Sequence, residues 1–416
     1  MVLEKFSLGV GDRFGHEGSA QLQSLQLAAN KGIIISPVWN KSYREHSIIG
    51  TAPSDARAAA DDAVKRCKWT HPYYVDADHI GLKTVDLFIQ SSDFYTIDVA
   101  DFIGSSADAG SIDAFVRSLR NFSGHLDIPG VHATLNVTEE DIRAVGKKYL
   151  LAVQEAGKIY RHIVSIKGAE NFVTEVSMDE TLESQSSTEL FFILAAIAQE
   201  GIPIQTIAPK FTGKFLKGID YVGPVEKFAR EFEDDLCVIS FAVNTFHLPP
   251  NLKLSVHSGS DKFSLYPSIH RIIGSRNAGL HLKTAGTTWL EELIGLAMSG
   301  GKGFAISQAI YADAYKRVDE LCKPYESVIE IDRRRLPEPK TVNGWNKDEF
   351  VAALRHDQSC PKYNLHFRQL LHLAYKLAAE MGDEFTHALD RSREYVGRNV
   401  TENLFERHIK PLFLGQ

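Results

Sequence analysis

The stretch Leu252-Lys-Leu-Ser-Val-His-Ser-Gly-Ser-Asp-Lys262 decides the fold, because it is one clear example of a pattern that recurs along the whole chain. A β-rich run, Leu252–Val256, ends in a polar cluster, and a helical pattern follows. We find eight such runs along the chain. They are Lys5–Val10, Gly32–Val38, Pro72–Val75, Phe94–Val99, Asn171–Val176, Ile202–Ile207, Leu252–Val256 and Gly279–Leu282.

Strands that alternate with helices form parallel sheets through right-handed crossovers. Eight of them predict an α/β fold of the (β/α)₈ TIM-barrel type. The count leaves room for an alternative, an open doubly wound sheet, because the run at Phe94–Val99 is weak and Cys237–Phe246 also has a strand-like pattern. No GxGxxG follows the first run, so a dinucleotide-binding half is not indicated.

Two segments exceed a minimal barrel. We predict a catalytic barrel domain over residues 1–330, with a helical insertion at about 101–150, and a helical C-terminal extension over 331–416 packed on the barrel. The boundary follows from the charged, proline-bearing stretch Arg333–Pro339. The last strong helical pattern is Asn364–Glu380, with a stripe of leucines.

Composition excludes several classes of protein. The 416 residues are 44% hydrophobic and 24% charged, which is typical of a globular chain. The net charge is −7 and there is no long basic run, so a nucleic-acid partner is not expected. Four scattered cysteines, no signal-peptide pattern and no apolar run of membrane length lead us to expect a cytoplasmic protein without a membrane partner. The oligomeric state stays open.

Catalytic groups of such barrels lie at the carboxyl ends of the strands, where the polar clusters fall. Three of the sixteen histidines, His79, His257 and His281, lie there. Imidazoles together with a carboxylate are typical ligands of a divalent metal, so we predict a metal site of these three histidines with Glu175. Other strand-end acids remained possible ligands: Asp76, Asp78, Asp179, Glu180 and Asp261. The alternative is that the histidines only pack or form hydrogen bonds.

The pattern Asp76-Ala-Asp78 places two carboxylates on one face of a strand, because strand side chains alternate. Like charges held together raise one pKa, which suits a general acid or base. We predict Asp78 and, across the mouth, Glu45 as the catalytic pair. Salt-bridged or capping aspartates and a surface glutamate are the alternatives.

Cations and hydroxyls at other strand ends suit an anionic substrate group. We predict substrate contacts from these side chains and from two of the strand-end acids. The full set is Arg13, Asp76, Lys210, Ser258, Asp261, Lys262, Lys283 and Thr284. The alternative chemical interpretation is that Lys210 or Lys283 forms a Schiff base with the substrate. The structural alternative is that the lysines only balance the charge of the acidic residues in the barrel.

Several strings resemble the tagaturonate epimerase family over about residues 7–380. They are Gly9-x-Gly-Asp-Arg-Phe-Gly15, Tyr43-Arg-Glu-His46, Val75-Asp-Ala-Asp-His-Ile80, Glu175-Val-Ser-Met-Asp-Glu-Thr181, His257-Ser-Gly-Ser-Asp-Lys-Phe263, Leu280-His-Leu-Lys-Thr-Ala-Gly-Thr287 and Tyr363-Asn-x-x-x-Arg-Gln-Leu-Leu-His372.

The resemblance implies a sugar-acid epimerase of hexuronate catabolism that interconverts tagaturonate and fructuronate, with a divalent metal (zinc, manganese, nickel or cobalt) and no nicotinamide. The inverted carbon is β to the ketone, so retro-aldol cleavage and re-addition is the expected route. In that scheme Glu45 and Asp78 handle the proton, while Arg13, Lys262 or Lys283 holds the carboxylate. The alternatives are a sugar isomerase or aldolase on the same barrel, and a sugar-acid-binding protein without catalysis.

Overall fold

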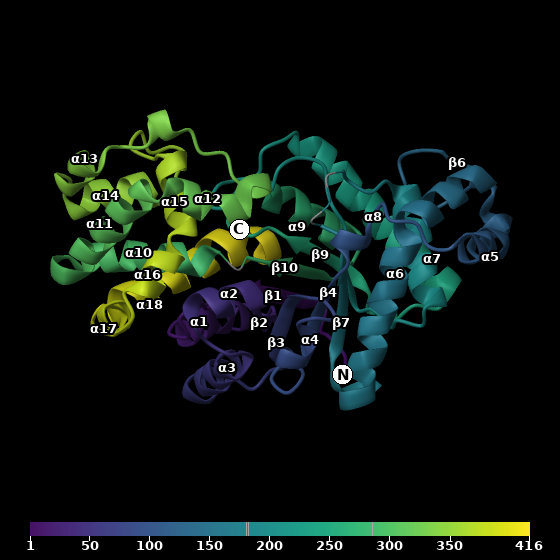
Figure 1. Ribbon diagram of the computed structural model, residues 1–416, viewed down its shortest axis with the longest axis horizontal. Helices are drawn as coiled ribbons and strands as arrows, with labels where there is room; N and C mark the ends of the chain where they lie inside the picture. Colours follow the sequence, from purple (N-terminus) through teal and green to yellow (C-terminus); the bar gives the residue numbers. More distant parts are fainter. Residues whose placement is uncertain (180, 182, 285) are drawn as a thin grey trace.

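Eight parallel strands close into a barrel in the order β1-β10-β9-β8-β7-β4-β3-β2. The structure is a computed structural model that describes residues 1–179, 181, 183–284 and 286–416 (Figure 1). The barrel strands are β1 (Phe6–Val10), β2 (Ser36–Ser42), β3 (Tyr74–Ile80), β4 (Phe94–Asp98), β7 (Val173–Ser177), β8 (Thr206–Ala208), β9 (Lys253–His257) and β10 (Leu280–Lys283). The predicted (β/α)₈ barrel is confirmed, and the open-sheet alternative is wrong.

A helix or helix pair follows each strand and covers the outside of the barrel. These helices are α1 (Gly18–Ala29), α2 (Tyr43–Ile49), α3 (Pro53–Cys67), α4 (Val85–Phe88), α5 (Ala109–Leu119), α6 (Glu139–Lys167), α7 (Ser187–Gln199), α8 (Val225–Phe246), α9 (Tyr266–Ser275) and α10 (Thr287–Ser299). Cys237–Phe246, which also had a strand-like pattern, lies inside α8. Its apolar residues at helical spacing pack against the barrel, as the buried side chains of α8 show.

The strand ends differ from the sequence prediction where polar side chains lie inside the sheet. β3 continues through Asp76-Ala-Asp-His79, and β2 runs on to Ser42, because the two strands pair as far as Ser42 and Asp78. The sequence favours a loop at these polar residues. The barrel interior accepts them because a buried lysine, Lys283, neutralises the carboxylates there.

The insertion after β4 is only partly helical. It holds α5, but also an antiparallel strand pair, β5 (Gly124–Leu126) and β6 (Leu135–Val137), and the first residues of α6. The prediction of a helical insertion is therefore wrong for its middle part. Three-residue strands carry too little alternation for the sequence pattern to reveal them.

The described chain that follows α10 is helical, and this includes the extension predicted to be helical over 331–416. Figure 1 shows these helices gathered at one side of the barrel, with α5 to α8 at the opposite side. They are α11 (Gly301–Lys316), α12 (Val318–Cys322), α13 (Pro339–Asn343), α14 (Lys347–Leu354), α15 (Leu365–Leu373), α16 (Tyr375–Glu380), α17 (Asp383–Arg391), α18 (Arg393–Glu402) and the π-helical segment Asn403–Leu414. The domain boundary at residue 331 stays a prediction.

The single helix predicted over Asn364–Glu380 is two helices that meet at Ala374. The carbonyl of Leu371, one turn before the break, accepts a hydrogen bond from the indole Nε1 of buried Trp289 at 2.8 Å and one from the Ala374 amide at 3.1 Å. This tighter turn ends α15. The packing against α10 thus sets the helix boundary.

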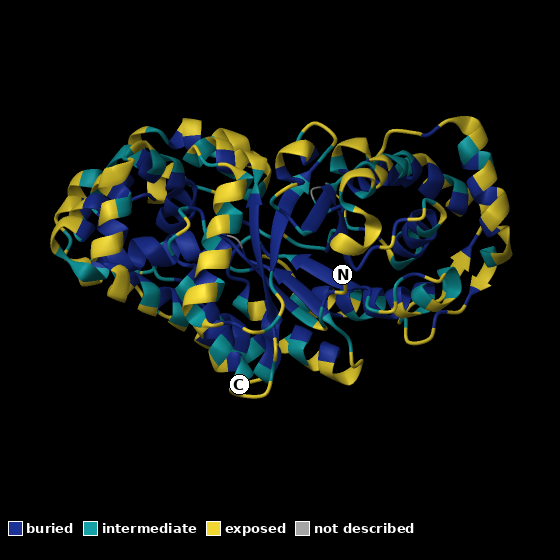
Figure 2. Cartoon of the chain, turned by 90° about the horizontal axis from the view of Figure 1, so that it is seen from below, coloured by how far each residue is buried: buried dark blue, intermediate teal, exposed yellow. Residues whose placement is uncertain are grey.

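Burial follows the layers of the barrel. Figure 2 shows the strands buried and the outer faces of the helices exposed. A small apolar cluster, Leu3, Val38, Tyr74, Phe94 and Val173, fills the barrel below the polar layer. Among the described residues, no helix is long and apolar enough to cross a membrane.

Candidate active site

A lysine at the end of β10 organises the polar layer of the barrel. The Nζ of Lys283 lies 2.8 Å from Asp76 Oδ2, 3.0 Å from Asp78 Oδ1 and 3.0 Å from Glu175 Oε1, and it also contacts the hydroxyl of Thr96. These side chains come from β3, β4, β7 and β10, and their inward direction follows from strand alternation. Lys283 therefore holds together three carboxylates that would otherwise repel one another.

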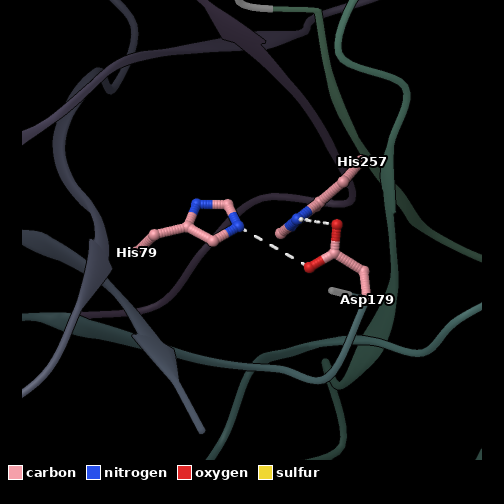
Figure 3. A group of neighbouring side chains, drawn as sticks. All are labelled: His79, Asp179 and His257. Carbon is pink, nitrogen blue, oxygen red and sulfur yellow. Dashed lines mark ion pairs between the residues drawn. The ribbon is translucent and has the colours of Figure 1, made fainter. Parts of the chain in front are cut away.

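Two histidines join this layer to a fourth acid at its rim. His257 Nε2 lies 2.8 Å from Glu175 Oε1, and His79 Nδ1 lies 2.9 Å from Asp78 Oδ1. The far nitrogen of each ring faces Asp179, at 3.6 Å from His79 Nε2 and 3.2 Å from His257 Nδ1. Figure 3 shows both rings pointing at the two oxygens of this carboxylate. Lysine, acids and histidines thus form a closed ring of alternating charge.

The side chains of His79, Asp179 and His257 can hold a metal ion. One ligand atom from each lies within 4.8 Å of the others, and this is the only such group among the described residues. The Nδ1 atom of His257 is buried and makes no hydrogen bond with any described residue. Asp78 and Glu175 bind the other nitrogen of each ring, an arrangement typical of metal-binding histidines. The donor set therefore fits a divalent transition metal.

The backbone conformation at His79 accounts for the direction of its side chain toward Asp179. His79 has φ +53°, in the left-handed region, and the pairing of β3 with β4 shifts register between Ala77 and Ile80. A bulge of this kind turns a side chain away from its alternating position. Backbone strain at a non-glycine residue is common at functional sites.

The pKa values follow the ring of charges. Burial opposes the charged form of every member, but opposite charges outweigh it. The pKa of His257 is raised to about 9 because Asp179 and Glu175 overcome the effects of burial and of Lys283. The pKa of His79 is raised well above its usual value by Asp78 and Asp179. Both rings are therefore cationic at neutral pH in the metal-free protein.

The two aspartates of β3 have opposite pKa shifts. Burial, with added repulsion from Asp78, raises the pKa of Asp76 to about 7 in spite of Lys283. Lys283 and His79 hold the pKa of Asp78 well below its usual range, although burial would raise it. The predicted raised pKa in this pair is confirmed, and it belongs to Asp76, the deeper of the two.

Glu45 lies beside this layer at the start of α2. It closes a capping box with Ser42, and its Oε1 accepts from Arg13 Nε at 2.9 Å. Burial and the repulsion of Asp78 raise the pKa of Glu45, but Arg13 together with the Ser42 amide lowers it further, so that the pKa lies below its usual value. Only 13% of the Glu45 side chain is exposed, so it is not a surface residue. The repulsion from Asp78 places the two predicted catalytic carboxylates near each other.

Other predicted site residues lie apart from the metal group. His281 is fully buried, hydrogen bonds to Ser7 at 2.9 Å, and packs on the ring of Phe94. Burial lowers its pKa to about 3, so its ring is neutral. His281 precedes Lys283 by two residues on β10 and occupies the layer beneath it, so it does not lie in the group of His79 and His257.

Asp261 is engaged by the C-terminal helices. Its Oδ2 lies 2.7 Å from Arg368 Nη2 and 3.1 Å from His356 Nδ1, and its Oδ1 lies 2.9 Å from Thr287 Oγ1 and 3.1 Å from His408 Nε2. Both oxygens are therefore occupied, which leaves none for a substrate. Asp261 anchors helices to the barrel instead.

The remaining predicted contacts divide by their partners. The hydroxyls of Ser258 and Thr284 donate to the backbone carbonyls of Lys283 and Gly9 and fix the loops after β9 and β10. Lys262 Nζ donates to Ser260 Oγ at 3.1 Å and lies fully buried. Lys210, half-buried, follows β8.

Two site residues differ from the sequence assignment. Asp179, kept only as an alternative ligand, faces both histidines, while Glu175 orients His257 from below. The sequence held a signal for Asp179. Side chains alternate along a strand, so residues 175, 177 and 179 are expected on the same side. Thr96, which links Asp76 and Lys283, gave no signal because threonine is common in strands. Glu180 lies outside the described residues.

Comparison with known proteins gives consistent results. Residues 1–412 match the model of the family described as UxaE, tagaturonate epimerase. The tagaturonate/fructuronate epimerase of Thermotoga maritima is 26% identical over 421 aligned residues, which cover 97% of this chain and 80% of that protein.

Solved structures share the fold. A glycerol-complexed crystal structure of fructuronate-tagaturonate epimerase UxaE from Cohnella laeviribosi superimposes with a TM-score of 0.80 at 23% identity, covering 99% of this chain and 82% of that one. The native structure of the same enzyme gives a TM-score of 0.78 at 22% identity, with coverage of 99% and 82%.

Proposed function

This chain belongs to the tagaturonate epimerase family, and from that membership together with its site we propose that it interconverts tagaturonate and fructuronate with the help of a divalent metal. It is an isomerase-class enzyme, an epimerase acting on carbohydrates. The observation that carries the metal proposal is the group of His79, Asp179 and His257, in which the buried Nδ1 of His257 makes no hydrogen bond among the described residues and lies 3.2 Å from the Asp179 carboxylate.

His79 Nε2, His257 Nδ1 and one oxygen of Asp179 are the proposed ligand atoms. Two nitrogens and one oxygen suit zinc, manganese, nickel or cobalt. Such an ion supplies Lewis-acid polarisation of a substrate carbonyl and stabilises negative charge that develops on its oxygen. Asp78 and Glu175 hold the rings in the orientation and tautomer that this requires.

The chemistry of the substrates supports a retro-aldol route. The two keto-hexuronates differ at a carbon β to the ketone, where removal of an α proton cannot invert the configuration. Transfer of the proton from the hydroxyl on that carbon to a base lets the adjacent carbon–carbon bond break, which gives an aldehyde and an enediolate. Rotation of the aldehyde and re-addition to its other face, with return of the proton, forms the epimer.

The residues of the chain have distinct proposed roles in this route. Asp78 and Glu45 are ionised carboxylates at neutral pH and accept and return the hydroxyl proton. Lys283 already contacts three carboxylates, so it stabilises the charged layer and does not hold the substrate. Arg13 and Lys262 remain for the substrate carboxylate.

Product analysis with the purified protein tests the reaction. We expect NMR to show fructuronate appearing from tagaturonate, and the reverse, in the metal-loaded enzyme. Exhaustive chelation should abolish turnover, and one of the four metals should restore it. Full activity after chelation contradicts the metal role. Aldo-uronate or cleavage products indicate an isomerase or aldolase, and binding without turnover indicates a sugar-acid-binding protein.

Metal content tests the ligand set independently of activity. We expect His257→Ala to lower the bound metal per chain, measured by elemental analysis. His281→Ala is the matched control, because it removes another buried histidine from the same barrel but one outside the ligand group. Equal metal content in folded His257→Ala and wild type contradicts the assignment.

A further inference from the structure

The C-terminal helices reach the barrel mouth through two side chains at the junction of α15 and α16. The guanidinium carbon of Arg13, in the loop after β1, lies 4.2 Å from the ring centroid of Tyr375. One turn earlier, His372 lies against the loop after β10 so closely that a Cβ atom on Gly286 would overlap its Nε2. His372 therefore stands at the same mouth as the proposed active site.

We propose that His372, together with Arg13 and Lys262, forms the subsite that binds the carboxylate of the substrate. His372 is 1% exposed, yet among the described residues neither of its ring nitrogens has a hydrogen-bond partner. Arg13 is 7% exposed, and its Nη1 is likewise buried without a hydrogen-bond partner in the part of the chain that the structure describes. Buried polar atoms in proteins nearly always have a partner, so unpaired ones in a family of enzymes point to a bound ligand.

The surroundings of His372 select an anion. The charges that act on it come from Arg13, Lys217, Lys262 and Arg368, and all of them are positive. Burial and these cations hold the pKa of His372 well below its usual value. Its neutral ring still offers one N–H donor. A buried concentration of positive charge is costly unless an anion is added, and a carboxylate provides one with two acceptor oxygens.

Lys262 supports this assignment from another element. It is 1% exposed, and within the described ranges its Nζ donates to a hydroxyl and a backbone carbonyl, both uncharged. Burial lowers its pKa to about 7, more than Asp261 and Asp220 raise it. An added carboxylate would restore the ordinary charge of this lysine. By contrast, each of the three guanidinium nitrogens of Arg368 already donates to Asp261 or to a backbone carbonyl, so Arg368 adds positive charge near the subsite but is not assigned as a contact to the substrate.

The order of the groups at the mouth agrees with the order of the functional groups in the substrate. Arg13 binds Glu45, Glu45 feels the charge of Asp78, and Asp78 binds His79. The carboxylate subsite, the two proton-accepting acids and the metal group therefore follow one another across the mouth. A keto-hexuronate carries its carboxylate and its ketone at opposite ends, with the inverted carbon between them. This inference rests on the proposed function for the identity of the anion.

Binding of tagaturonate to the metal-loaded protein tests the subsite without requiring turnover. We expect His372→Ala to raise the Kd, measured by calorimetry, about tenfold to a hundredfold, the value of a hydrogen bond to a charged group. His372→Gln, which keeps a donor, should recover a large part of this loss. His366→Ala is the matched control, because His366 lies on the same helix, is buried, and accepts from the Asp332 amide away from the mouth.

The role of charge is tested with the ketohexose in which a hydroxymethyl group replaces the carboxylate. Wild type should bind the uronate much more tightly than this neutral sugar. The ratio of the two Kd values should be smaller in His372→Ala than in wild type. An unchanged Kd in His372→Ala, or an equal loss for both sugars, overturns the inference. If wild type binds the uronate but does not epimerise it, the proposed function fails while the subsite stands.

Discussion

Replacement of Asp261 by asparagine separates a structural role from the substrate role that the sequence predicted. Asp261 is fully buried, and its two oxygens accept from Arg368, His356, Thr287 and His408. An asparagine of the same size keeps one acceptor, but it removes the negative charge and turns an NH₂ group toward donors. Arg368, which is also fully buried, then loses its ion-pair partner.

The expected magnitude follows from the burial of both partners. Removal of one member of a buried ion pair costs about 3–5 kcal/mol, because the remaining charge stays desolvated. The entropy of unfolding of 416 residues is about 0.9 kcal/mol/K, at about 2.1 cal/mol/K per residue. The melting temperature should therefore fall by about 3–6 °C.

Differential scanning calorimetry measures this change. Glu394→Gln is the control, because it removes one carboxylate charge from an exposed pair with Arg398 and should shift the melting temperature by less than about 1 °C. Loss of both charges, in Asp261→Asn with Arg368→Met, should recover part of the stability.

The pH dependence sharpens the test. Arg368 and the neighbouring histidines hold the pKa of Asp261 well below its usual value although burial would raise it. The contribution of Asp261 to the free energy of unfolding is therefore present above the pKa of an unfolded aspartate and is lost only in acid. The effect of Asp261→Asn should be constant from about pH 6 to pH 8. An unchanged melting temperature with a raised KM would refute the structural assignment and restore the substrate role.

Three further predictions concern the charged layer. Glu175→Gln should weaken metal binding about 10–100-fold in a chelator competition, because Glu175 orients His257, and an unchanged affinity would contradict that role. Metal binding should release protons and become tighter from pH 6 to pH 8, because the pKa values of His79 and His257 are raised and only neutral rings bind a metal. Calorimetry in buffers of different ionisation enthalpy detects the released protons. Binding heats that do not depend on the buffer would contradict this prediction. Lys283→Met should lower the free energy of unfolding by at least about 3 kcal/mol at pH 8 and less at pH 5.5, because three buried carboxylates lose the lysine that they share and take up protons on folding. Urea midpoints at the two pH values measure this change, and a larger loss of stability at pH 5.5 than at pH 8 would contradict it.

Much of the barrel could be predicted because its strands are buried on both faces and interrupt a helical periodicity. Each predicted run overlaps an observed strand, and β1 (Phe6–Val10) differs from its prediction by one residue. The predicted run ends too early at β3, because it stops at Val75 whereas the strand continues through Asp76 and Asp78, which pair along β2. Polar residues mark the end of a strand only when no buried counter-charge is present. Here the counter-charge is Lys283, which lies more than 200 residues away in the sequence, so no local pattern reveals it.

The candidate site was predictable as a region and not as a ligand set. His79 and His257 stand at strand ends in the sequence, and the structure brings both against Asp179. His281 also stands near a strand end in the sequence, but it lies outside the proposed ligand group, because it occupies the layer below and hydrogen bonds to Ser7. Two residues of strand length decide this difference, which is within the uncertainty of any strand boundary taken from a pattern.

The amino-acid sequence by itself determined the order of strands and helices, the barrel class and the collection of acids, histidines and lysines at one end of the barrel. Only the tertiary structure decided which of them face one another. Barrel closure brings residues 79, 179 and 257 together, a bulge turns His79 toward the others, and α15 carries His372 to the mouth from the far end of the chain. The physical reason is that periodicity is local, whereas the partner of a buried charge is chosen by packing between segments remote in the sequence.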